Sequence, residues 1–128
     1  MRLLLDTHAL LWWLAGDEAL SAAARMAIGD DGNMVYVSAA STWEIATKHR
    51  IGKLPHVAAI AGDLDATIRA QGFLGLPISL RHGERAGALP GPHRDPFDRM
   101  LIAQAMTEGM VLVSNERVFD DYAVGRMW

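Results

Sequence analysis

The residues of this sequence that are best suited to chemistry are acidic side chains at the ends of apolar segments. They are Asp6, Glu44, Asp98 and Glu116, with Asp95 shortly before Asp98. Carboxylates that a fold gathers within a few ångströms repel one another, which raises their pKa values and lowers stability unless a cation binds among them. Oxygen ligands without sulfur favour Mg²⁺ or Mn²⁺, and such ions activate water and neutralise charge on a phosphodiester. The acidic set therefore predicts a metal-dependent phosphoesterase.

Whether these side chains meet depends on the elements that carry them. Short, uninterrupted apolar runs such as RLLLD at 2–6 predict strands that are buried on both faces. The expected strands are 2–6, 34–38, 73–79, 110–114 and 123–127. The expected helices are 7–15, 18–30, 38–54, 57–72, 80–88 and 95–108, with a helical turn at 115–121. This alternation predicts an α/β fold, a three-layer α/β/α sandwich around a central parallel sheet.

In such a sheet the carboxyl ends of the strands and the amino ends of the helices share one edge, where ligands bind. Asp6 ends the first strand, and Glu44 lies in the first turns of the helix after the second. Asp98 opens the helix before the fourth strand, and Glu116 follows that strand. We therefore expect these four carboxylates to converge as the catalytic and metal-binding residues.

The first two positions also have ordinary structural explanations. Asp6 can cap the helix that starts at Thr7. Ser41 and Glu44 fit the S-x-x-E capping box, and Glu44 can pair with Lys48 on the next turn. The residue types alone leave both explanations open.

The same holds for the later positions. Asp95 before Pro96 fits an N-cap with proline at N1, and Asp98 on the first turn suits the helix dipole. We assign Asp98 to the metal and Asp95 to the cap at the start of the helix. Asp95 fits an outer-shell role around the metal equally well. Glu116 can be a solvated loop residue. Three hydroxyl residues at strand ends either orient ligands or cap helices and turns: Thr7, Ser38 and Ser114.

Composition sets outer limits. The 128 residues, about half of them apolar, predict a single domain over 1–128. The net charge of −3 decides nothing about a nucleic-acid partner, and the lack of cysteine excludes disulfides, thiol nucleophiles and cysteine-ligated zinc. Asp6 and His8 interrupt the only stretch that looks like a signal peptide, and no apolar run approaches the roughly 18 residues of a spanning helix. We expect a cytoplasmic protein with no membrane contact.

Four segments together resemble the PIN domain family, and within it the VapC-type toxins of bacterial toxin–antitoxin pairs. They are LLLDTHALLWW (3–13), VYVSAASTWEIATKHRIGKL (35–54), HRDPFDRMLIAQA (93–105) and LVSNERVFDDYAV with the terminal RMW (112–128). The resemblance runs from end to end, and it is carried by the order and spacing of the motifs. It implies a Mg²⁺- or Mn²⁺-dependent endoribonuclease that leaves a 3′-hydroxyl and a 5′-phosphate. It also implies a homodimer that a cognate antitoxin inhibits near the active site.

Residue by residue, Asp6, Glu44 and Asp98 match the first three acidic positions of that family. The fourth position is usually an aspartate after a threonine, before a phenylalanine. Here Ser114, Glu116 and Phe119 stand at the three places. The glutamate keeps the charge but reaches one methylene further, which puts direct binding of a second ion in doubt.

Basic and aromatic residues near these motifs suggest how RNA is held. Lys48, Arg50 and Arg94 can contact phosphates, and Arg99 can hold a carboxylate or a phosphate. Together with His49, Lys53 and Arg117 they can equally form a solvated face or meet an acidic partner. We interpret Trp12 and Trp13 as core or dimer contacts. His8 and His93 lie beside acidic residues and could help position substrate, but we interpret both as surface or capping residues.

Two other functions compete with the nuclease. A phosphatase or receiver domain also places an aspartate where Asp6 lies, but the phosphatase pattern needs a second aspartate at the position of His8. A catalytically weak RNA- or protein-binding module is the second alternative, and only Glu116 supports it. The chain has no Walker-type phosphate loop and no G-x-S-x-G nucleophile motif.

Overall fold

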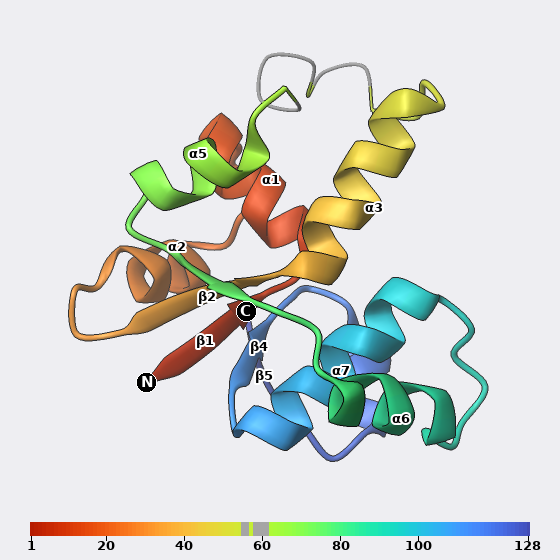
Figure 1. Cartoon of the computed structure of the whole chain (residues 1–128). Helices are drawn as coiled ribbons and strands as arrows, with labels where there is room; N and C mark the ends of the chain where they lie inside the picture. The colour runs from red at the N-terminus through yellow and green to blue at the C-terminus, as the bar shows by residue number, and fades with distance from the viewer. Residues whose placement is uncertain (55–56, 58–61) are drawn as a thin grey trace.

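A computed structural model describes residues 1–54, 57 and 62–128 of the chain. Its centre is a five-stranded sheet in the order β3-β2-β1-β4-β5, and every neighbouring pair is parallel (Figure 1). The strands are β1 Arg2–Leu5, β2 Met34–Ser38, β3 Leu74–Leu76, β4 Val111–Val113 and β5 Gly125–Met127. The predicted parallel α/β sheet is confirmed.

Helices cover both faces of the sheet. They are α1 Thr7–Ala15, α2 Ala22–Gly29, α3 Ala39–Arg50, α5 Leu64–Ala70, α6 Leu80–Ala88 and α7 Pro96–Glu108, followed by a 3₁₀ helix, η2 Arg117–Asp121. Successive strand side chains point to opposite faces, so Leu3 and Leu5 pack in one core cluster with residues of α1, α2 and α5. Leu4 packs in a second cluster with residues of α7. The three-layer sandwich follows from this alternation.

Helix α3 contacts helices of both layers. It packs against α1 and against α7 (Figure 1). It leaves β2 at the carboxyl edge of the sheet, where its first residues meet the first residues of the other two helices. This arrangement carries Glu44 toward both Thr7 and Asp98.

Several predicted boundaries are wrong. The helix expected at 18–30 starts only at Ala22, because Ser21 caps it by accepting from the Ala24 amide at 3.0 Å. The helix expected at 38–54 covers 39–50, and the chain turns at Gly52 with a φ of 79°. The strand expected at 73–79 pairs only over 74–76. Of the helix expected at 57–72, residues 64–70 are helical, while 58–61 lie outside the described residues.

The remaining predicted elements lie within a few residues of their expected positions. In the described ranges, no helix has both the length and the apolar character that crossing a bilayer requires.

Candidate active site

The strand order places β1 between β2 and β4, so the chain winds outward from β1 in both directions. Ligands of doubly wound sheets bind outside the carboxyl ends of the strands at this reversal. Asp6 follows β1 directly, and its backbone amide extends the ladder by donating to the Val113 carbonyl of β4 at 3.1 Å. Asp6, one of the four expected site carboxylates, therefore lies where the topology favours a site.

The Asp6 carboxylate is buried, with 4% of the residue exposed. Its Oδ1 accepts from the Ala9 amide at 2.8 Å, so it caps α1. The pKa of Asp6 is raised to about 6, mainly by burial and to a smaller extent by the charge of Asp98, while Ser114, Ala9 and His8 act in the opposite direction. The capping explanation is correct, but it does not account for a charge buried beside a second aspartate.

Glu44 is also buried, with 6% of the residue exposed. The capping box expected at Ser41 and Glu44 is absent, because Ser38 caps α3 by accepting from the Ala40 amide at 2.9 Å. Glu44 instead turns toward α1, where Thr7 Oγ1 donates to its Oε1 at 2.6 Å. Its Oε2 pairs with Lys48 Nζ.

This pairing bears on the basic residues expected to bind substrate. Lys48 lies against a site carboxylate, as the helical spacing allowed, and not free in solvent. Arg50 and Arg94 are exposed. Their contact with substrate stays a prediction.

Asp98 lies on the first turn of α7. Asp95 caps that helix by accepting from the Asp98 amide at 3.0 Å, with Pro96 at N1, as predicted. Burial raises the pKa of Asp98, and the charges of Asp95 and Glu44 raise it too, whereas His93 lowers it. Asp98 is therefore electrostatically coupled to Asp6 on one side and to Glu44 on the other.

His93 contacts a site carboxylate, which goes beyond the surface or capping role expected of it, and its part in positioning substrate stays a prediction. Its Nε2 lies 2.8 Å from Asp98 Oδ2, and its ring packs edge-on to Phe119 with centroids 6.4 Å apart. The sequence signal for this contact was the position of His93 two residues before the N-cap Asp95. A residue two places before an N-cap can fold its side chain back over the first turn of the helix.

Arg99 does not hold a carboxylate. Its guanidinium donates to the backbone carbonyls of Ala86, Leu89 and His93, at distances between 2.5 and 3.2 Å. The last carbonyls of a helix lack partners within it, and the planar fork of arginine can satisfy several at once. Arg99 therefore fixes the end of α6 and the loop that carries His93.

The last predicted members are spread along the edge. Ser114 Oγ accepts from the Glu116 amide at 3.0 Å, and the Ser114 side chain also lowers the pKa of Asp6. Glu116 itself is exposed, and it is not among the groups that shift the pKa of Asp6 or Asp98. The structure thus brings together Asp6, Glu44 and Asp98, while Glu116 stands at the rim.

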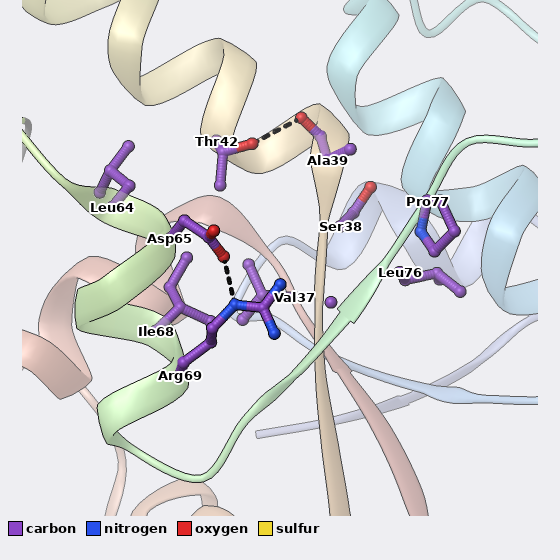
Figure 2. Close-up of a pocket in the computed structure, with 11 residues that line it drawn as sticks. Val37, Ser38, Ala39, Thr42, Leu64, Asp65, Ile68, Arg69, Leu76 and Pro77 are labelled. Carbon is purple, nitrogen blue, oxygen red and sulfur yellow. Dashed lines mark hydrogen bonds and ion pairs between the residues drawn. The ribbon is translucent and has the colours of Figure 1, made fainter.

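Hollows lie beside α3 and along α1. One of about 380 Å³ lies beside the start of α3, with Ser38 near Pro77 on one side and the Asp65–Arg69 ion pair on the other (Figure 2). A second, of about 410 Å³, runs along α1 past Trp12 and Leu54. Trp12 and Trp13 are partly buried against the core, as expected of core contacts.

The three carboxylates offer only oxygen donors, which suits Mg²⁺ or Mn²⁺. As placed, Glu44 is bonded to Thr7 and Lys48, Asp98 is bonded to His93, and Asp6 accepts from the Ala9 amide. Within the described ranges, no group of three or more acidic or histidine side chains has the spacing to hold an ion. The oxygen donors suit a divalent cation by their chemistry, but as placed they do not surround one, and Lys48 and His93 would have to move aside for an ion to bind.

Comparison with known proteins agrees with this geometry. Residues 3–125 match the PIN domain family. The chain belongs to the PIN domain family. It is 33% identical over 118 residues to Ribonuclease VapC22 of Mycobacterium tuberculosis, covering 89% of this chain and 86% of that protein.

Solved structures share the fold at low identity. The VapBC2 complex of Rickettsia felis bound to a promoter DNA fragment matches with a TM-score of 0.71 at 15% identity, over 100% of this chain and 99% of that chain. VapC20 of Mycobacterium tuberculosis, a toxin that cleaves the sarcin–ricin loop, matches with a TM-score of 0.58 at 18% identity, over 93% of each chain. These likenesses confirm the PIN fold.

Proposed function

We propose that this PIN domain protein is a metal-dependent endoribonuclease that hydrolyses RNA phosphodiester bonds, and that it is the toxin of a toxin–antitoxin pair. The observation that carries the proposal is the meeting of Asp6, Glu44 and Asp98 from three separate elements at the switch point of the sheet. The resemblance of the chain to a curated ribonuclease over most of both lengths supports the choice of RNA as substrate.

Asp6, Glu44 and Asp98 would hold the Mg²⁺ or Mn²⁺ ion. When bound, the ion supplies charge neutralisation at the phosphodiester and a more acidic water. The choice of carboxylates is supported by the burial of Asp6, whose charge is destabilising until a cation offsets it.

The chain's own residues prepare this site. Thr7 holds one oxygen of Glu44, which fixes the orientation of that side chain. Asp95 holds the first turn of α7 and thereby the backbone of Asp98. Ser38 and Ser114 support the ends of β2 and β4. The exposed Arg50 and Arg94 supply positive charge for the phosphates of an approaching strand.

Glu116 takes an outer role in this proposal. It is exposed and separate from the three coupled carboxylates, so we assign it to a metal-bound water or to a second ion that arrives with substrate. Glu116→Gln should then lower activity less than Asp98→Asn does.

The proposed partners are an antitoxin and a second copy of the chain. A toxin–antitoxin complex of Klebsiella pneumoniae contains a chain of this fold. The apolar hollow along α1, lined in part by His8, Trp12 and Leu54, offers a surface for a partner segment. The exposed apolar residues Trp43, Ile78 and Leu80 support self-association.

The test is cleavage of a mixed pool of structured RNA by antitoxin-free protein, with Mn²⁺, with EDTA and with the Asp98→Asn variant. We expect fragments only when both metal and Asp98 are present. Asp65→Asn, which neutralises an exposed carboxylate on α5, is the matched control and should cut normally. Equal cutting by Asp98→Asn, or cutting in EDTA, would contradict the proposal, and RNA that is retained uncut would indicate the binding module instead.

A further inference from the structure

A largely buried polar network joins the start of α3 to α6 and α7. We call it the Gln104 network, and its side chains are Ser38, His82, Gln104 and Glu108. Gln104 and Ser38 are 0% exposed and His82 is 2% exposed. Gln104 interrupts the apolar run LIAQA of α7, where an apolar side chain would serve packing alone.

Gln104 connects three segments of the chain. Its Oε1 accepts from Ser38 Oγ at 2.5 Å, and Ser38 in turn caps α3. Its Nε2 donates to the Pro77 carbonyl after β3 at 3.3 Å and lies 3.5 Å from His82 Nδ1 in α6. In the close-up, Ser38 lies on the Pro77 side of the hollow, away from the Asp65–Arg69 pair (Figure 2).

His82 determines which way the Gln104 amide points. His82 Nδ1 accepts from the Ser79 amide at 3.0 Å, so that nitrogen carries no proton in the neutral ring. The proton is then on Nε2, which donates to Glu108 Oε1 at 2.8 Å. An acceptor at Nδ1 favours the NH₂ end of Gln104, which leaves the amide oxygen for Ser38.

The network joins the helices that carry two of the site carboxylates. Gln104 lies on α7 with Asp98, and Ser38 begins α3, which carries Glu44. A buried amide is destabilising unless its hydrogen bonds are made, and a satisfied network permits one arrangement of the groups it connects. We propose that Gln104 is a positioning residue of the nuclease, which holds the start of α3 against α7 and thereby sets Glu44 relative to Asp98. This inference rests on the proposed function.

The first test measures position in the metal-free protein. Because the chain has no cysteine, Ala46→Cys on α3 and Thr107→Cys on α7 give two unique spin-label sites. Gln104→Met keeps the side-chain length and removes all three polar contacts. We expect the distance distribution between the labels to shift or broaden in Gln104→Met. Ile102→Val, an apolar change at a fully buried position of the same helix, should leave it unchanged.

The second test measures the site. Mn²⁺ affinity is read from the free-ion resonance signal at a temperature where each variant is fully folded, and kcat and KM are read at saturating Mn²⁺. We expect Gln104→Met and Ser38→Ala each to weaken Mn²⁺ binding several-fold and to lower kcat about ten-fold with little change in KM. The double variant should be no worse than either single one. Ser21→Ala, which removes the cap of α2, should stay within twofold of the parent.

The outcomes separate the two ideas. An unchanged label distance, or Mn²⁺ affinity and kcat within twofold of the parent in folded Gln104→Met, would overturn the positioning role while the parent still cuts RNA. A parent that neither binds Mn²⁺ nor cuts RNA would overturn the proposed function itself. In that case a changed distance between the spin labels in Gln104→Met would show that the Gln104 network stabilises the fold and has no role in a nuclease site.

Discussion

Neutralising Asp6 should make the metal-free protein more stable. The variant is Asp6→Asn, whose amide oxygen can keep the cap on the Ala9 amide. Burial raises the pKa of Asp6 from 3.8 to about 6. Each pKa unit corresponds to about 1.4 kcal/mol, so the buried charge lowers the free energy of unfolding at pH 7 by about 3 kcal/mol.

The sign follows from proton binding. Between the unfolded and folded pKa values the folded chain holds the Asp6 proton that the unfolded chain has lost, so stability falls as pH rises through this window. From pH 4.5 to pH 7 the parent should lose about 2 kcal/mol through Asp6, a loss that is absent in Asp6→Asn. Since the new amide is itself buried, we expect a net gain at pH 7 of about 1–3 kcal/mol.

The assay is urea unfolding in chelator-treated buffer at both pH values, with and without Mn²⁺. Asp63→Asn is the matched control, because Asp63 makes the same cap at 3.0 Å but is exposed. It should change stability by no more than about 0.5 kcal/mol. If Asp6→Asn is less stable than the parent at pH 7, or if its stability falls with pH as steeply, then Asp6 does not bury an uncompensated charge.

Four further predictions concern Lys48, the protons of Asp6, Gly91 and Trp43. Lys48→Met should destabilise the metal-free protein by about 1–2 kcal/mol, since Glu44 loses its partner. The same variant should bind Mn²⁺ more tightly in calorimetry. Weaker binding would show that Lys48 does not compete with the ion. Mn²⁺ binding should release about half a proton from Asp6 at pH 6 and about a tenth of a proton at pH 7. The release is measured from binding heats in buffers of different ionisation enthalpy. Equal proton release at both pH values would refute the raised pKa of Asp6. Gly91→Ala should lower the free energy of unfolding by about 1–3 kcal/mol, because φ is 96° and the new Cβ would lie 2.8 Å from Tyr122 Oη. Adding Tyr122→Phe should recover part of this loss in thermal unfolding. No recovery would place the strain in the backbone alone. Trp43→Glu should convert a dimer to a monomer in sedimentation, since Trp43 is 61% exposed beside Phe97, and an unchanged dimer would place the interface elsewhere.

The layers of the fold could be predicted from the sequence because the strands are strongly patterned. Three consecutive leucines, Leu3 to Leu5, have to be buried on both faces of a sheet, and parallel strands with helical crossovers supply both covers. Boundaries that depend on one hydrogen bond were less accessible. Ser21 starts a helix at a place that the apolar pattern did not mark.

The candidate site divides in the same way. Asp6, Glu44 and Asp98 were placed together from topology, since the edge they share follows from the strand order. Contacts across that edge were not accessible, because they depend on side-chain direction. His93 contacts Asp98, Arg99 donates to three backbone carbonyls, and Gln104 on α7 accepts from Ser38. None of these contacts has a fixed sequence spacing from which it could be predicted.

The three site carboxylates differ in how their charge is balanced, and this difference points to the place of the ion. Glu44 is paired with Lys48, and Asp98 is bonded to His93. Among the described residues Asp6 has the Ala9 amide and the Ser114 hydroxyl as partners but no ammonium or guanidinium group, although it is the least exposed of the three. The charge of His8 lowers the pKa of Asp6, but the described contacts give Asp6 no ion pair, and a buried carboxylate without one is the most unfavourable of these arrangements. A divalent cation at this edge would therefore gain most from Asp6, and Glu44 and Asp98 would join it by exchanging the partners that they now hold.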